Sequence, residues 1–185
     1  FFLMKKKSIE LLCFTIILTV SCAEKLDYEE EKAAIIDVIE AETEAFFSKD
    51  INRLASYHIQ DESNIRLTAT KSGYTYDVGW DKIESFFLDY FENVMGPGEY
   101  YEVKKNYKIK IYDESAWAAY DNFYYNSDDE LLSTSIHTQI LENVNGEWKI
   151  VFYTSIYNST WEEIAAGSDM LEFGSEENQP QAELE

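Results

Sequence analysis

The hydrophobic positions in the first half of the chain follow a helical period. In EEEKAAIIDVIEAETEAFFSKD the apolar residues return every three or four positions, which predicts an amphipathic helix from about residue 28 to 48. INRLASYH predicts a short second helix, and NIRLTAT and GYTYDVG predict two short strands. WDKIESFFLDYFENVM returns to the helical spacing and stops at the GPG of residues 96–98, so it predicts a third helix.

From Tyr100 onward, the pattern changes to the alternation of strands. Four long strands are expected in EVKKNYKIKIYD, SAWAAYDNFYYNS, LLSTSIHTQILENV and EWKIVFYTSIYNS. The connections between them are so short that neighbours must run antiparallel, as a meander. Helices followed by a meander indicate an α+β domain, with the helices covering one face of a curved antiparallel sheet.

The chain begins with an export signal. From Met4, the plausible start, MKKKSIELLCFTIILTVSC has three lysines and an apolar run of about ten residues, shorter than the roughly 20 that span a bilayer. LTVSC resembles a bacterial lipobox, which implies that residues 1–21 are a signal peptide removed on export and that Cys22 carries palmitate or a similar lipid. Residues 22–27 would then be a tether. The expected location is the cell envelope, at the periplasmic face or the cell surface, with membrane contact only through this anchor.

Charge and cysteine content narrow the possible partners. The formal net charge is −21, and loss of the three lysines and one glutamate of residues 1–21 makes it −23, so nucleic acid and anionic lipid are not expected to bind. Cys13 leaves with the signal and Cys22 is lipidated, so no disulfide is expected. The two histidines, His58 and His137, are far apart in sequence, and neither a metal nor another cofactor is expected. Residues 28–160 form the predicted domain, and residues 161–185 form an acidic tail expected to be partly disordered.

Three stretches in order resemble one family. AFFSKDINRLASYH, VGWDKIESFFLDYF and NGEWKIVFYTS are similar to the nuclear transport factor 2-like superfamily, in particular its SnoaL-like group, over about residues 28–158. The motifs are Gly79 with Ile83 and Phe87, followed by a Gly, Trp, Ile pattern in the last hairpin. The resemblance implies a cone-shaped, cystatin-like roll: a curved antiparallel sheet wrapped around the N-terminal helices, with a pocket at its open end.

The turns predict which side chains face that pocket. A two-residue turn at Asn145 and Gly146 would place His137 opposite Thr154 and Gln139 opposite Phe152. A turn at Asp128 and Asp129 would place Tyr120 opposite His137. The strand residues predicted for the pocket are Tyr120, Asn122, His137, Gln139, Phe152 and Thr154. The resemblance adds Tyr57 and Trp80 at the rim. The residues predicted for an apolar patch on the outer face are Trp117, Phe123, Tyr125, Ile140, Val151 and Tyr153.

These assignments leave several functions open. The preferred one is an anchored protein that binds a small, mostly neutral ligand or a protein partner, without catalysis. The alternative is an isomerase, hydrolase or dehydratase that uses His137 and Tyr120, since a histidine can serve as a general base near neutral pH. The predicted face supplies no carboxylate to orient this histidine. The resemblance extends to ketosteroid isomerases, in which a pocket carboxylate transfers the proton. In this chain Arg66 falls at the position of that aspartate, which argues against isomerase chemistry. His58 is expected at a helix end or on the surface.

A third possibility is a structural dimerisation module whose pocket is filled by its own side chains. A homodimer through the outer sheet face is expected to cover the apolar patch. The alternative cover is the tail, through its apolar residues Ile164, Met170, Leu171 and Phe173.

Overall fold

The computed structural model describes residues 27–94 and 100–159. The predicted signal peptide, the lipidation site at Cys22 and the acidic tail lie outside these ranges. Within them, none of the helices has the length and apolar character needed to cross a membrane.

The helices begin and end close to where the sequence predicts. α1 spans Tyr28–Phe47, and the Asp27 side chain accepts hydrogen bonds from the backbone N–H groups of Glu29 and Glu30 at its start. α2 spans Ile51–Ser56, capped in the same way by Asp50. α3 spans Trp80–Asp89 and continues as the π-helical turn η1, Tyr90–Val94. The three predicted helices are confirmed.

Six strands form one sheet in the order β2-β1-β6-β5-β4-β3. The four long strands are the predicted antiparallel meander. The short hairpin of β1 and β2 joins the same sheet because β1 pairs in parallel with β6, so the expectation of a purely antiparallel sheet was wrong in this one pair. The strands are β1 Ile65–Thr70, β2 Gly73–Val78, β3 Tyr100–Tyr112, β4 Ser115–Asn126, β5 Leu131–Val144 and β6 Glu147–Tyr157.

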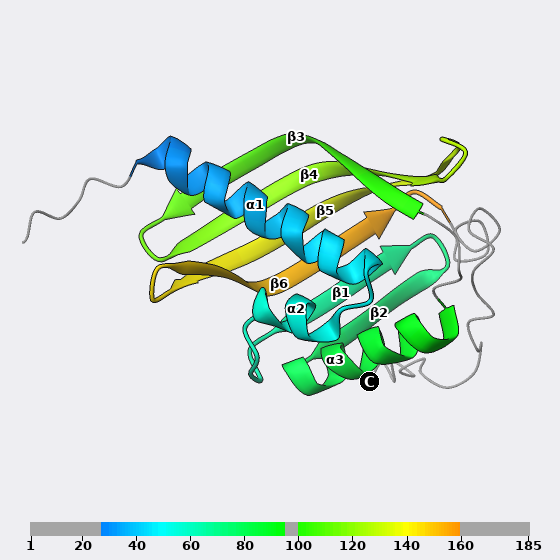
Figure 1. The fold of residues 1–185 in the computed structure, drawn as a ribbon, viewed down its shortest axis with the longest axis horizontal. Coiled ribbons are helices and arrows are strands. Elements are labelled where there is room, and N and C mark those ends of the chain that lie inside the picture. Colours follow the sequence, from blue (N-terminus) through cyan, green and yellow to red (C-terminus); the bar gives the residue numbers. More distant parts are fainter. Residues whose placement is uncertain (1–26, 95–99, 160–185) are drawn as a thin grey trace, which may run out of the picture.

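The helices cover one face of the sheet (Figure 1). α1 crosses the long strands and buries Ile35 and Ile39 completely against Leu141 and Ile150. α2 and α3 pack at the β1 and β2 side, around Leu54 and other buried apolar residues. This arrangement confirms the predicted α+β class.

β3 contains a bulge that changes which of its residues face the helices. Lys105 pairs with Asp121 and Lys108 with Ala119, so Asn106 and Tyr107 together lie opposite one residue of β4. Asn106 adopts the left-handed conformation there, with φ of 58°. The apolar alternation in the sequence predicts a single unbroken face for β3. The bulge instead places Glu102 and Lys104 on the helix-covered face.

A second bulge changes the register of β6. Leu141 pairs with Ile150 as predicted, but Ile140 then pairs with Phe152, which leaves Val151 as an extra residue. His137 consequently lies opposite Ser155, and Thr154 pairs with Thr138. The predicted inward positions of Phe152 and Thr154 were therefore wrong: both lie on the outer face, and Tyr153, predicted on the outside, lies on the helix-covered side.

The register between β4 and β5 is confirmed from Ser115 with Glu142 to Tyr124 with Ser133. Tyr120 lies opposite His137 and Asn122 opposite Ser135. A further shift follows, because Tyr125 pairs with Leu131 and the Asn126 N–H donates to the Glu130 carbonyl. The predicted two-residue turn at Asp128 and Asp129 was therefore wrong. Asn145 and Gly146 form the predicted turn, with positive φ at both residues.

Candidate functional site

The helix-covered face of the sheet carries a row of buried polar side chains. Four of the predicted pocket residues, Tyr120, Asn122, His137 and Gln139, lie on this face and are at most 3 % exposed. Ser133, Ser135, Tyr153, Ser155 and Tyr157 join them from β5 and β6. A sheet face this polar under a helical layer is unusual, because a buried polar group destabilises the fold unless it is hydrogen-bonded.

His137 is held between two hydroxyl groups. Its Nε2 lies 2.8 Å from the Ser135 hydroxyl oxygen and its Nδ1 lies 3.2 Å from that of Tyr153. A neutral imidazole has one N–H donor and one acceptor, so the two hydroxyls satisfy both ring nitrogens. Burial lowers the pKa of His137 to about 3, and the Lys104 ammonium adds to this shift. The geometry therefore gives His137 a structural role and does not favour it as a general base.

Tyr120, the other proposed catalytic residue, also has a hydrogen-bond partner within the fold. Its hydroxyl accepts a hydrogen bond from the Gln139 side chain at 3.1 Å. Burial raises the pKa of Tyr120 well above its usual value, with further contributions from nearby ionisable groups, Tyr153 first among them. Tyr120 and His137 contact each other through their rings, whose centroids are 5.2 Å apart.

The charged centre of this face is Glu102, which the sequence prediction missed. Its side chain retains 15 % exposure, and its nearest cation is Lys104, at 3.9 Å. The Lys104 side chain is 1 % exposed, and its ammonium lies closer to Glu40 of α1, at 3.0 Å. Burial raises the pKa of Glu102, and the charge of Lys104 and the amide of Asn122 oppose that rise.

Tyrosines surround Glu102. For each of six tyrosines, burial is the main cause of a raised pKa, and the Glu102 carboxylate adds to the rise. These residues are Tyr90, Tyr107, Tyr120, Tyr124, Tyr153 and Tyr157. Tyr90, Tyr124 and Tyr157 are only partly buried, so solvent reaches this end of the face.

Several polar atoms on the same face have no hydrogen-bond partner among residues 27–94 and 100–159. They include both the amide nitrogen and the amide oxygen of Asn122, the hydroxyl oxygen of Ser133 and the side-chain oxygen of Gln139. Asn122 is 1 % exposed, and Ser133 lies diagonally across from it on β5. The Asn122 amide is close enough to Glu102 to favour its charged form without meeting the geometry of a hydrogen bond.

Arg66 closes the β1 side of the face. It forms an ion pair with Asp77 of β2 at 3.0 Å, and its guanidinium lies 3.5 Å from the ring centre of Phe86. Burial lowers the pKa of Arg66, while Tyr153 and Asp77 favour its charged form. Asp77 offsets the charge of Arg66, which still opposes the raised pKa values of Tyr90, Tyr153 and Tyr157.

The two predicted rim residues lie at the other end of the sheet. The Tyr57 carbonyl accepts a hydrogen bond from the backbone of Ile150, and Trp80 is buried against His58, with 5.2 Å between their ring centres. His58 lies at the end of α2, as one of the two predicted alternatives had it, and its N–H donates to the Ala55 carbonyl. It is 5 % exposed and lies 3.4 Å from Glu42, so the alternative of a surface position was wrong. Tyr57 and Trp80 are part of the packed core and do not join Glu102.

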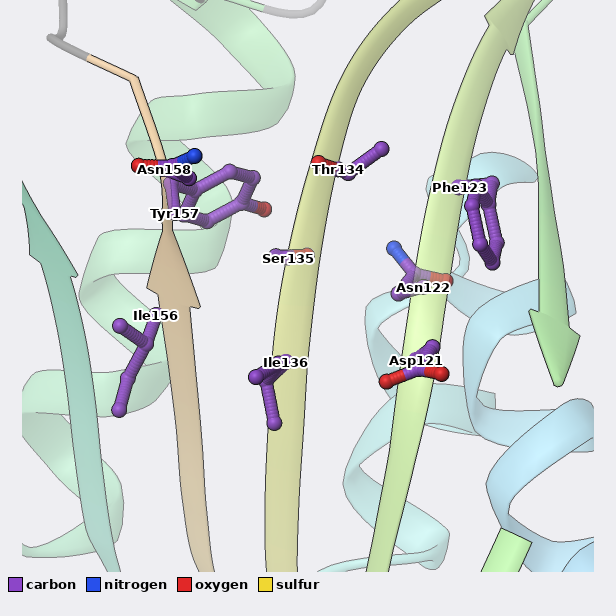
Figure 2. Close-up of a pocket in the computed structure, with 9 residues that line it drawn as sticks. All are labelled: Asp121, Asn122, Phe123, Thr134, Ser135, Ile136, Ile156, Tyr157 and Asn158. Atoms are coloured by element: carbon purple, nitrogen blue, oxygen red, sulfur yellow. The ribbon is translucent and has the colours of Figure 1, made fainter. Parts of the chain in front are cut away.

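A groove of about 400 Å³ opens on the outer face of the sheet, where β4, β5 and β6 lie side by side (Figure 2). Strand alternation directs Phe123, Ile136 and Ile156 to this side, together with Asp121 and Thr134. Asn122, Ser135 and Tyr157 contribute to the lining from the same strands, although alternation turns their side chains toward the helices. The groove and the polar face are therefore two sides of the same three strands.

No group of three or more histidine, cysteine, aspartate or glutamate side chains in residues 27–94 and 100–159 is arranged to hold a metal ion.

Comparisons with known proteins identify the fold. No family model and no curated protein matches the chain. A protein of unknown function with a cystatin-like fold from Nostoc punctiforme has 12 % identity and a TM-score of 0.57, over 70 % of this chain and 92 % of its own. An NTF2-like protein of unknown function from Pseudomonas putida has 16 % identity and a TM-score of 0.59, over 72 % of this chain and 91 % of its own.

A ketosteroid isomerase-like protein from Erwinia carotovora atroseptica has 18 % identity and a TM-score of 0.54, over 72 % of this chain and 100 % of its own. Identities this low establish the architecture and leave the activity open. The chain therefore has the nuclear transport factor 2-like, cystatin-like fold that the sequence motifs predicted.

Proposed function

We propose that this protein is a lipid-anchored envelope protein that binds a small organic ligand on the helix-covered face of its sheet. The ligand site includes Asn122 and Ser133 and opens to solvent beside Glu102. The protein acts as a binding protein. The enzymatic alternative through His137 and Tyr120 is not favoured, because both side chains are already hydrogen-bonded and a base with a pKa of about 3 is a poor proton acceptor near neutral pH.

The observation that supports the proposal is the unpartnered amide of Asn122. A buried amide without hydrogen bonds costs roughly 1–3 kcal/mol. Asn64, an asparagine that is equally buried, is hydrogen-bonded. Its amide nitrogen donates to the backbone carbonyls of Ile59 and Ile150, at 2.7 Å and 3.2 Å. This contrast supports a ligand-binding role for Asn122 and a structural role for Asn64.

The two asparagines provide a matched experiment. Asn64→Leu should lower the free energy of unfolding by about 2 kcal/mol or more, because it removes hydrogen bonds to the backbone carbonyls of Ile59 and Ile150. Asn122→Leu should cost less, because leucine has the same branched skeleton and the amide atoms that it replaces make no hydrogen bond to the described residues. What it loses is the support that the amide gives to the charged form of Glu102. Urea unfolding of the mature chain measures both values.

Ligand binding is then tested with the same variants. A thermal-shift screen of metabolites should find compounds that stabilise the native protein, and Asn122→Leu should lose that stabilisation although it folds. The control is Asn52→Leu, at an exposed position of α2, which should respond like the native protein. If Asn122→Leu is as destabilised as Asn64→Leu, or if it keeps every ligand response, Asn122 does not bind a ligand and the proposal fails.

A further inference from the structure

The charges around Glu102 do not balance. Three carboxylates act on one another there: Glu102 itself, with Glu40 and Glu42 from α1. Lys104 is the ammonium among them, and it lies closer to Glu40 than to Glu102. His58 contacts Glu42 at 3.4 Å, and Arg66 is paired with Asp77. The carboxylates that act on Glu102, together with Glu102 itself, therefore outnumber the ammonium groups described beside them.

Polar atoms beside this charge lack partners. The amide oxygen of Asn122 and the hydroxyl oxygen of Ser133 can both accept hydrogen bonds, and neither has a partner in the part of the chain that the structure describes. An ammonium group supplies three donors and one positive charge, so it can satisfy a carboxylate and two neutral acceptors together. A neutral hydroxyl supplies one donor and no charge.

We propose that the ligand of this site carries a protonated amine, which binds to the carboxylate of Glu102 and the side-chain oxygens of Asn122 and Ser133. The inference rests on the proposed function and specifies its ligand class. It replaces the mostly neutral ligand expected from the sequence, because Glu102 could not be placed on this face before the bulge in β3 was known. The rings of Tyr90 and Tyr157, both partly buried near Glu102, supply an apolar wall for the carbon skeleton of the amine.

Paired probes test the ligand class directly. Benzylamine and benzyl alcohol differ in charge and little in shape, and so do cyclohexylamine and cyclohexanol. Calorimetric titration of the mature protein at pH 7.5 should show each amine binding about tenfold or more tightly than its alcohol, as expected for a charge-assisted contact. Glu102→Gln should remove that preference and leave the weak binding of the alcohols unchanged.

Further variants keep the test independent of folding. Glu102→Asp retains the charge and should retain the amine preference. Glu142→Gln makes the same chemical change at an exposed position of β5 and should behave like the native protein. Thermal unfolding of each variant without ligand shows whether it is folded.

The outcomes separate this inference from the proposed function. If amines bind no better than alcohols, or if folded Glu102→Gln keeps the amine preference, the amine inference is wrong. Should neutral metabolites still bind and lose binding in Asn122→Leu, the proposed function survives that failure. If no compound of either class binds and Asn122→Leu behaves like the native protein, both are wrong.

Discussion

His137 shows how a buried titratable residue can stabilise the fold without taking part in chemistry. Its ring nitrogens contact the hydroxyls of Ser135 and Tyr153, and its ring contacts Tyr120. The side chain therefore orders three strands at once. Because the folded protein holds this ring neutral, protonation of His137 destabilises the folded state relative to the unfolded chain.

The first prediction concerns the pH dependence of stability. The pKa of His137 is lowered from 6.5 to about 3 on folding, so between these values the unfolded chain binds a proton that the folded chain does not. The stability that neutral His137 contributes is therefore complete above pH 6.5 and is lost as the pH falls toward 3, at up to about 1.4 kcal/mol per pH unit. His137→Gln should remove this part of the pH dependence.

Urea unfolding of the two proteins at pH 7, 6 and 5 checks this. The raised pKa of Glu102 contributes a slope of the opposite sign in both proteins, so it cancels in the comparison. The native protein should lose stability more steeply than His137→Gln over this range. Parallel curves would show that His137 is protonated as easily in the fold as in the unfolded chain.

At the scale of the elements, hydrophobic period and turn chemistry were enough to predict all three helices and all six strands. The Asn145 and Gly146 turn also fixed the first pairs of the last hairpin, from Val144 with Glu147 to Leu141 with Ile150. The errors begin where the register shifts, and the bulges in β3 and β6 are the shifts that change the predicted site. A single extra residue reverses every later side chain of a strand, and neither Val151 nor Asn106 stands out in an alternating sequence.

The bulges explain which site residues were missed. Without the one in β6, Thr154 would lie across from His137; with it, Tyr153 contacts the ring instead. Without the one in β3, Glu102 would lie on the outer face, so the carboxylate that the sequence prediction lacked could not be found. Asn106 was the available signal, since asparagine tolerates a left-handed backbone better than most residues.

The second prediction tests that signal. Asn106→Val should lower the free energy of unfolding by about 1–2 kcal/mol, because a β-branched residue is strained at φ of 58°. Asn106→Gly should have a smaller effect, since glycine adopts this conformation freely and loses only an exposed hydrogen bond to Asp121. Chemical unfolding measures both, with Lys108→Val in the regular ladder as the control. Equal losses for the valine and glycine variants would contradict the account.

At the scale of the whole molecule, the outer sheet face is the main exposed apolar surface of the described residues. Ile136, Ile156 and Ile140 are 56 %, 53 % and 40 % exposed, and Trp117 is 38 % exposed. The groove of Figure 2 lies within this surface and is lined by Ile136 and Ile156. Contiguous apolar surface of this kind marks an interaction site. We propose that it is covered by a second copy of the chain.

The third prediction follows from that proposal. The mature chain without its lipid should sediment as a dimer, and Ile136→Glu should make it a monomer because the carboxylate would be buried at the interface. Leu88→Glu, at a position of α3 that is 49 % exposed, is the matched control and should leave the dimer intact. A native chain that sediments as a monomer would instead favour the tail as the cover.

The fourth prediction concerns the anchor, which lies outside the described residues. Growth with labelled palmitate should label the full-length protein, and Cys22→Ser should abolish the label because the serine cannot form the thioether that precedes acylation. Cys13→Ser should remain labelled, since the proposed cleavage before Cys22 would remove that residue. Labelling that persists in Cys22→Ser would exclude Cys22 as the lipid attachment site.

The place of β6 in the sheet also affects when the chain can fold. β6 is the last strand in sequence, yet it lies between β5 and β1 and joins the meander to the N-terminal hairpin. Nearly the whole domain must therefore be synthesised before its sheet can close, and contacts so distant in sequence form slowly. A chain that stays open until its last strand appears would meet a requirement of the proposed export, in which an unfolded chain crosses the membrane.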